Sequence, residues 1–367
     1  MKNIVLLLTL MVIASTNPFL TADGSDNNDV LIGVYFYPWY SITQGKHWRG
    51  VDAVIDKPFW GFYDSYNESI IKMQLVLIKH AGIDFIVFSW WGPNSFEDMS
   101  IKAIVRHLAE YGLKFAVMIE PYLGSKIKPD EPNNPYNKTF WKNVLSYLSE
   151  NYILPYKDNY LHLYGKPLVL AFNPIGMKYN PSNDFPEYTI RITGNDIDNA
   201  HYQDWDYWPD YIDPNNVNLR IRKDGYVSIM PRFDNTHLTE KETKICIDQN
   251  YTQLLYQKEW EWILKHRDNI KIIMITSWNE YHERTMIEPH YDATANVDPF
   301  YIYDLTVMYI KVLKNNYQTN NYCTQIDDKT SNYTLLTYVI IGVITGLIIY
   351  NVTSRIFRLL MSRVSIS

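Results

Sequence analysis

Short apolar runs that alternate with helical segments constrain the fold of this 367-residue chain more than any other feature. In the clearest run, Ile272–Ile275, four apolar residues follow one another and three of them are β-branched. Continuous runs of this kind are typical of strands that are buried on both faces of a parallel sheet. We predict strands over residues 30–39, 84–90, 114–122, 166–173, 188–193, 226–231 and 272–275.

Helical periodicity fills most of the intervals between these strands. Apolar residues recur at helical spacing over residues 67–82 and stop at Gly82, a typical C-cap. Ser95, with Asp98 three residues later, resembles the start of a second helix. We predict helices over residues 67–82, 95–111, 140–154, 250–267 and 299–317.

The alternation of strands and helices predicts a (β/α)8 barrel, with a doubly wound open sheet as the alternative. No G-x-G-x-x-G or Walker motif opens a helix, so a nucleotide-binding sheet lacks its usual sequence signature. An eighth strand is not evident, and a short piece near residues 285–288 is the candidate. An aromatic-rich insertion, which includes Trp205, Tyr207 and Trp208, follows the fifth strand.

Both ends of the chain indicate a membrane-anchored protein. Residues 1–22 have the form of a secretory signal peptide, with an uncleaved anchor as the alternative. Residues 335–352 are almost wholly apolar and long enough to span roughly 30 Å of hydrocarbon, with a buried core helix as the alternative. The tail over residues 353–367 contains three arginines, which places it in the cytoplasm. The main domain, residues 23–320, and its linker, 321–334, are then expected outside the cytoplasm, in an extracellular or lumenal space.

Composition narrows the partners. A net charge of −6 argues against nucleic acid. The two cysteines, Cys246 and Cys323, are too few for a disulfide scaffold, and whether they pair is left open. Glycosylation sequons begin at Asn67, Asn137, Asn250 and Asn332.

Two carboxylates, Glu280 and Glu283, appear directly after the last predicted strand. On a turn, residues three apart lie on one side with their Cβ atoms roughly 5–6 Å apart. Carboxylates that close are expected to have different pKa values, and glycoside hydrolysis uses one as acid and one as base. A solvated loop with two ordinary glutamates is the alternative, but the flanking Trp278, Tyr281 and His282 favour a ligand site.

Polar and aromatic residues also follow the other predicted strands, and barrel strands end at one common face. These residues are Tyr37, Trp39 and Tyr40 after the first strand, Trp90 and Trp91 after the second, Glu120 and Tyr122 after the third, and Asp234 after the sixth. Aromatic rings suit the apolar faces of sugars, and carboxylates accept hydrogen bonds from hydroxyl groups. The set therefore predicts a carbohydrate site, although core packing remains the alternative for any single ring.

Other chemistries lack their patterns in this sequence. The spacing of a zinc-binding helix is absent around His282, and we expect neither a metal nor a cofactor. No G-x-S-x-G motif is present for a serine nucleophile.

Several motifs together resemble glycoside hydrolase family 99, the endo-α-1,2-mannosidases and endomannanases. They are Tyr35-Phe-Tyr-Pro-Trp-Tyr40, Gly45-Lys-His-Trp48, Gly61-Phe-Tyr-Asp-Ser65, the stretch from Ala81 to Trp91, Ile119-Glu-Pro-Tyr122, and Ile275-Thr-Ser-Trp-Asn-Glu-Tyr-His-Glu283. The resemblance extends over about residues 31–310. It implies a (β/α)8 barrel that hydrolyses α-mannosidic linkages within glycans, with net retention and without a metal.

The same resemblance implies roles for individual residues. Glu280 would be the base on the 2-hydroxyl of the −1 mannose, which forms a 1,2-anhydro sugar. Glu283 would protonate the leaving oxygen and later activate water. Lys46 and His47 would line sugar subsites together with Tyr122 and the residues named above, and the substrate would be a mannose-containing oligosaccharide or a glycoprotein glycan.

Three positions depart from the family pattern. Tyr281 replaces a Trp, Arg284 replaces the Gly after the second glutamate, and Arg232 stands where a Gly is expected. We hypothesise that the two arginines narrow the cleft or bind an anionic substituent, so that the substrate differs from plain mannan. Because of Arg284, an inactive glycan-binding protein on the same fold stays an alternative, and a transferase is a third interpretation.

Overall fold

The computed structural model describes residues 30–49, 54–121, 137–172, 179–194, 203–209, 213–238 and 244–314. The predicted signal peptide, linker, membrane helix and tail lie outside these residues, as do Tyr122 and Cys323. Among the described helices, none has the length and apolar character that crossing a membrane requires. The chain divides into two compact units, residues 1–307 and 308–367, and the second is described only at the end of helix α7.

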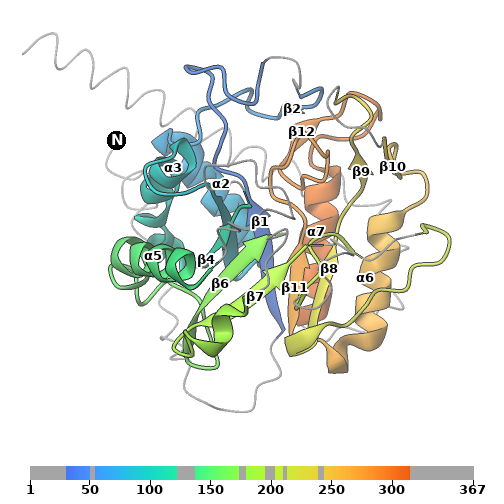
Figure 1. Cartoon of the computed structure of the whole chain (residues 1–367). Helices are drawn as coiled ribbons and strands as arrows, with labels where there is room; N and C mark the ends of the chain where they lie inside the picture. Colours follow the sequence, from blue (N-terminus) through green and yellow to red (C-terminus); the bar gives the residue numbers. More distant parts are fainter. Residues whose placement is uncertain are drawn as a thin grey trace, which may run out of the picture. The chain divides into compact units, whose positions relative to one another are not determined.

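All seven predicted strands form, and they run parallel in one sheet (Figure 1). The strands are β1 (Leu31–Phe36), β3 (Phe85–Trp90), β4 (Lys114–Ile119), β6 (Lys166–Phe172), β7 (Thr189–Thr193), β8 (Tyr226–Ile229) and β11 (Ile272–Ile275). The first strand, β1, pairs with both β3 and β11, so the last strand returns to the first. This strand order alone also fits an open sheet, and the contacts of residues 203–209 with β7 and β8 distinguish the predicted (β/α) barrel from a doubly wound sheet.

The eighth position in this barrel lies between β7 and β8, and residues 203–209 occupy it. Trp205 forms a parallel bridge with Thr193 of β7. From the other side, the hydroxyls of Tyr226 and Ser228 donate to the backbone oxygens of Asp206 and Tyr207, each at 2.7 Å. These side-chain bonds replace a backbone ladder, so no regular strand forms.

The prediction of a strand near residues 285–288 is wrong. Ser277 donates its backbone N–H to Thr285 O, and Ile287 N donates to Ser277 O, both at 2.9 Å. The segment thus runs beside the continuation of β11 and does not join the sheet.

Alternate strand residues fill the barrel interior, as expected for strands with a period of two. The interior cluster includes Tyr35, Phe85, Val87, Ala116, Met118, Leu168, Leu170, Tyr226, Ile272 and Met274. A Cβ atom at Gly33 would lie 2.3 Å from the Phe85 ring and 2.6 Å from the Met274 sulfur. Glycine is therefore required for β1 to approach its neighbours.

Helices lie outside the strands (Figure 1). They are α2 (Glu68–His80), α3 (Phe96–Val105), α4 (Leu108–Tyr111), α5 (Lys138–Leu148), α6 (Leu255–His266) and α7 (Tyr301–Lys314). Asn67, Ser95 and Asn137 cap α2, α3 and α5 with their side-chain oxygens. The helix predicted from residue 250 begins only at Leu255, whose backbone N–H is bound by the Asp248 carboxylate at 2.9 Å.

Short elements complete the chain. The two-residue strands are β2 (Lys57–Pro58), which pairs with β12 (His290–Tyr291), β9 (Phe233–Asp234), which pairs with β10 (Cys246–Ile247), and β5 (His162–Leu163), which pairs with β6. A π-helical turn, η1 (Ser149–Ile153), extends α5, and 3₁₀ turns lie at η2 (Pro181–Asn183), η4 (Lys223–Gly225) and η5 (Arg267–Asn269).

Candidate active site

One turn at the end of β11 carries both glutamates. A cis peptide joins Thr276 and Ser277, and the chain then turns over residues 281–284. Thr285 N donates to Glu280 O at 3.2 Å and closes the turn. Glu280 and Glu283 therefore share one tight turn at the C-terminal end of a barrel strand, where barrel enzymes place their functional groups.

Asn279 fixes this turn against the first strand. Its Oδ1 accepts from Tyr37 N at 2.8 Å, and its Nδ2 donates to Tyr37 O at 3.0 Å. The Tyr40 hydroxyl donates to Asn279 O at 2.9 Å and accepts from Tyr281 N at 3.1 Å. Tyr40 is fully buried, so it supports the turn from inside the protein. Sequence reasoning had not singled out Asn279, although it lies inside the most specific motif.

The Glu280 carboxylate is held on one side only. Its Oε1 accepts from His282 N at 2.9 Å and lies 3.2 Å from His282 Nδ1. No described residue forms a hydrogen bond with Oε2. This arrangement orients the carboxylate and leaves its second oxygen available for a substrate proton.

Glu283 has a different partner, which sequence reasoning did not identify. The indole Nε1–H of Trp208 donates to Glu283 Oε2 at 2.9 Å. Trp208 belongs to the segment that occupies the eighth position of the barrel. The sequence marked this segment as aromatic-rich but gave no indication that it contacts the carboxylates.

Replacing Trp208 with phenylalanine should lower kcat on a mannoside about ten-fold or more. The ring and its packing remain, but the negative charge that Glu283 acquires when it gives up a proton loses a hydrogen bond, and a bond to a charged group is worth about 1.5–3 kcal/mol. Steady-state kinetics with a chromogenic mannoside measure the effect. Phe172, whose ring centroid lies 5.7 Å from that of Trp208, provides a control as Phe172→Leu, which keeps the indole donor. An unchanged kcat in Trp208→Phe would show that the bond has no part in turnover.

Near the carboxylates, Tyr37 and Tyr207 share a very short hydrogen bond between their hydroxyls. Burial raises the pKa of both phenols, and the neighbouring Glu280, Glu283 and Glu120 raise the pKa further. Both hydroxyls therefore stay protonated and act as donors or acceptors without charge.

A third carboxyl, Glu120, belongs to the same group. It is 5% exposed, and its Oε1 accepts from Ser89 Oγ at 2.7 Å. Burial raises the pKa of Glu120 to about 8 against the effect of Ser89, and the negative charge of Glu280 adds to the increase. At neutral pH, Glu120 is thus a neutral acid that can donate to a sugar hydroxyl.

The pKa of Glu120 predicts a pH dependence of stability. Because the folded-state pKa lies above the unfolded value, the folded state binds more protons between about pH 4.5 and 8, and stability falls as the pH rises through this window. The slope is at most about 1.4 kcal/mol per pH unit. In Glu120→Gln this fall should be reduced, as measured by urea unfolding at pH 5 and pH 8. An identical slope in the variant and the wild type would contradict the assignment.

An aromatic wall borders these carboxyl groups. Trp39 stacks on His47, with ring centroids 4.6 Å apart and planes 10° apart, and meets His282 edge-on at 5.9 Å. Trp91 lies 6.3 Å from Trp39 and donates its Nε1–H to Ser89 Oγ at 3.1 Å. Burial, with His282 and Lys46 nearby, lowers the pKa of His47 to about 3, so its imidazole is neutral.

Lys46 lies at the rim beside this wall. Its ammonium lies over the Phe96 ring, 4.6 Å from the centroid. The structure therefore brings together Tyr37, Trp39, Lys46, His47, Trp91, Glu120, His282, Glu280 and Glu283 near one end of the barrel.

Besides Tyr40, four predicted ligand-binding side chains are fully buried and support the site. Trp90 alternates with the inward Ser89 and donates to Asp98 at 2.8 Å on the outer face of β3. Tyr281 donates to Glu288 at 2.8 Å. Trp278 and Asp234 are also 0% exposed. A barrel rim alternates inward and outward residues, and adjacency to a strand end does not distinguish them.

The hypothesis that the two departing arginines face the substrate is wrong. Arg284 binds both oxygens of Asp56 at 2.8 and 3.0 Å and Asp234 at 2.6 Å. Arg232 binds Asp56 at 2.9 Å and Asp292 at 2.5 Å. All of these side chains are 0% exposed, so neither guanidinium narrows a cleft or meets an anionic substituent. Asp56 lies 176 residues from Arg232 and 228 from Arg284 in the sequence, so local patterns could not reveal these pairs.

The same region contains the one group of possible metal ligands among the described residues, Asp56, His290 and Asp292. The guanidinium of Arg232 binds both carboxylates and lies 3.5 Å from His290 Nε2. A guanidinium already occupies the place where a cation would bind, so the group does not fit a metal.

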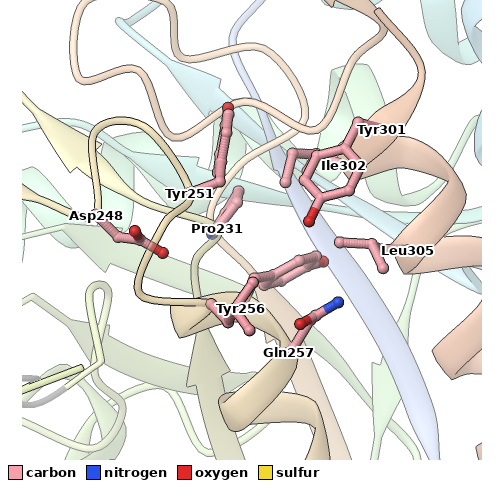
Figure 2. Close-up of a pocket in the computed structure, with 9 residues that line it drawn as sticks. Pro231, Asp248, Tyr251, Tyr256, Gln257, Tyr301, Ile302 and Leu305 are labelled. Carbon is pink, nitrogen blue, oxygen red and sulfur yellow. The ribbon is translucent and has the colours of Figure 1, made fainter. Parts of the chain in front are cut away.

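A small pocket lies elsewhere, beside helix α6 and the start of α7 (Figure 2). Its lining includes Tyr251, Tyr256 and Leu305 and is mostly apolar. The Asp248 carboxylate at its edge is bonded to Gln253 N and Leu255 N. None of the carboxyl groups of the β11 turn lines this pocket.

Comparisons with known proteins were made on sequence and on structure. Neither a protein-family model nor a curated protein matches the sequence. Two solved structures of the GH99 endo-alpha-mannosidase from Bacteroides thetaiotaomicron, one of them in complex with BIS-TRIS-propane, do match. Each is 16% identical, has a TM-score of 0.56, and aligns over 78% of this chain and 98% of its own.

These two matches define the class of fold. The chain has a (β/α) barrel similar to that of the GH99 endo-alpha-mannosidase. The resemblance that the sequence motifs had indicated is confirmed at the level of the fold.

Proposed function

We propose that this protein is a retaining, endo-acting glycosidase that cleaves α-mannosidic linkages in glycans. The observation that carries the proposal is the pair of glutamates on one turn, each with its own partner. Glu280 is oriented by His282, and Glu283 by Trp208. Glycosidases need two carboxyl groups of unlike role on either side of the scissile bond.

In the first step, Glu280 accepts the proton of the 2-hydroxyl of the −1 mannose. The sugar O2 attacks C1 and forms a 1,2-anhydro ring as the bond from C1 to the glycosidic oxygen breaks. Glu283 gives its proton to that oxygen, and the leaving sugar departs as an alcohol. The Oε2 atom of Glu280, which has no hydrogen-bond partner among the described residues, suits the role of proton acceptor.

In the second step, Glu283 takes a proton from water, and the resulting hydroxide attacks C1. The C1–O2 bond opens, and O2 recovers its proton from Glu280. Two inversions at C1 give net retention. Protonated Glu120 and the Tyr37–Tyr207 pair would bind hydroxyl groups of the −1 sugar without adding negative charge.

The glycan-binding alternative depended on Arg284 as an obstacle in the site. Its side chain is buried among aspartates, which removes that argument. The membrane anchor remains part of the proposal: residues 335–352 would hold the barrel on the extracytoplasmic side of a membrane, where glycoprotein glycans are found.

The experiment is product analysis with the full-length protein. It is incubated with a high-mannose glycan and with an α-mannosyl disaccharide fluoride, and the products are separated by mass. The proposal expects oligosaccharides larger than mannose to be released, with the α-anomer formed first. Free mannose as the sole product would refute endo action, and binding of the glycan without release would support a lectin.

A further inference from the structure

We propose that Arg284 and Arg232 are positioning residues that hold the turn of Glu280 and Glu283 in its catalytic geometry. This inference rests on the proposed function and assigns the two arginines a role in place of substrate contact. Neither side chain is exposed, so neither can contact a substrate. We therefore expect each arginine to affect the glutamates through the turn.

The position of Arg284 in the chain attaches its side chain to the catalytic turn. It follows Glu283 directly, and its guanidinium is bound by three aspartates from three separate segments, Asp56, Asp234 and Asp292. Thr294 Oγ1 accepts a further bond from Nη2 at 2.8 Å. One end of the catalytic turn is therefore attached to three parts of the barrel rim.

Two further hydrogen bonds fix the backbone of the turn. Asp234 N donates to Glu283 O at 2.9 Å, and Arg232 Nε donates to Arg284 O at 2.9 Å. Asp234 thus binds the Arg284 side chain and the Glu283 backbone at once. A movement of the turn that displaces the backbone of Glu283 has to break these bonds.

The backbone of Arg284 has a φ of 55°, which lies in the left-handed region. Residues with a Cβ atom are disfavoured there, and they persist where their surroundings hold them. Glycine would satisfy this backbone more easily, but it provides no side chain to anchor. The guanidinium also has five donors in a rigid plane, which a lysine ammonium does not reproduce.

The test compares Arg284→Lys with the wild type, both as full-length protein. We expect kcat on the disaccharide fluoride to fall at least ten-fold at a temperature well below the melting temperature of the variant, while KM changes less than three-fold. In Arg284→Gly, added guanidinium ion should restore part of the lost kcat. A purely structural role would instead change the melting temperature and leave kcat unaltered.

Arg191→Lys is the matched control. Arg191 forms a bidentate pair with Asp224 at 2.6 and 3.0 Å, and its hydrogen bonds reach no residue of the catalytic turn. This variant should melt at a lower temperature with kcat within two-fold of the wild type. Equal losses of kcat in Arg191→Lys and Arg284→Lys would overturn the proposal.

Thr294→Val, at an exposed residue, is the second variant if Arg284→Lys does not fold. It should lower kcat about three-fold, and an unchanged kcat would overturn the proposal.

Crystal structures separate this proposal from the proposed function. If the wild type cleaves no mannoside, the function is wrong, but the geometry can still be examined without a substrate. In Arg284→Lys, the Glu283 carboxylate should lie away from the Trp208 indole, which it meets at 2.9 Å in the wild type. An unmoved carboxylate would show that the arginine does not position it.

Discussion

Replacing Glu283 with glutamine should lower kcat on a high-mannose glycan by about 10²–10⁴-fold, the usual contribution of a general acid–base group. The amide keeps the shape of the side chain and can still accept the Trp208 bond, but it cannot protonate the leaving oxygen. On the mannosyl fluoride the loss should be smaller, because fluoride departs without a full proton transfer. Initial rates on both substrates measure the difference.

Glu280→Gln is the matched comparison, since the base is needed whatever the leaving group is. Its loss of kcat should be similar on the glycan and on the fluoride. The opposite pattern, with fluoride hydrolysis rescued in Glu280→Gln and lost in Glu283→Gln, would mean that the two roles are exchanged. Equal small losses in both variants would exclude the turn as the catalytic site.

Replacing Asp56 with alanine should destabilise the protein by about 3–5 kcal/mol, the usual loss when one partner leaves a buried ion pair. Asp56 binds both arginines and accepts from Ala293 N at 2.8 Å, so its removal leaves two buried cations short of partners. Urea unfolding at pH 7 measures the change. Glu68→Ala, which removes an exposed pair with Lys72, is the control and should unfold like the wild type.

Acid unfolding gives an independent check on the same aspartates. Arg284 and Thr236 lower the pKa of Asp234 to about 2 against the effect of burial, and Asp292 is shifted in the same direction. A carboxyl with a depressed folded-state pKa stabilises the protein above its unfolded pKa, and this stability is lost as the pH falls through the folded value. The loss is expected between about pH 4 and pH 2.

The strands could be predicted from the sequence because burial on both faces imposes continuous apolar runs. The residues at which the strands end could not be predicted in this way. The first strand was expected to reach Trp39, yet β1 ends at Phe36 because the Asn279 side chain binds the backbone of Tyr37 in place of a neighbouring strand. The segment in the eighth position was missed for a similar reason, since side-chain hydroxyls hold Asp206 and Tyr207 where a ladder would be expected.

In the candidate site, too, some features could be predicted from the sequence and others could not. The three-residue spacing of Glu280 and Glu283 was enough to predict a shared turn. The partner of Glu283 was not predictable, because Trp208 lies 75 residues away and no local pattern connects them. The prediction that the arginines face the substrate failed for the same reason. In the sequence, Arg284 is a charged residue beside the site, and only its long-range aspartate partners show that it points away from the substrate.

The most direct test of the account is the release of oligosaccharide from a high-mannose glycan by the wild type, Glu280→Gln and Glu283→Gln, followed by mass spectrometry under identical conditions. The account predicts release by the wild type and almost none by either variant, with all three proteins equally stable and equally able to bind the glycan. Release at the wild-type rate by either variant would contradict the assignment of the turn as the catalytic centre.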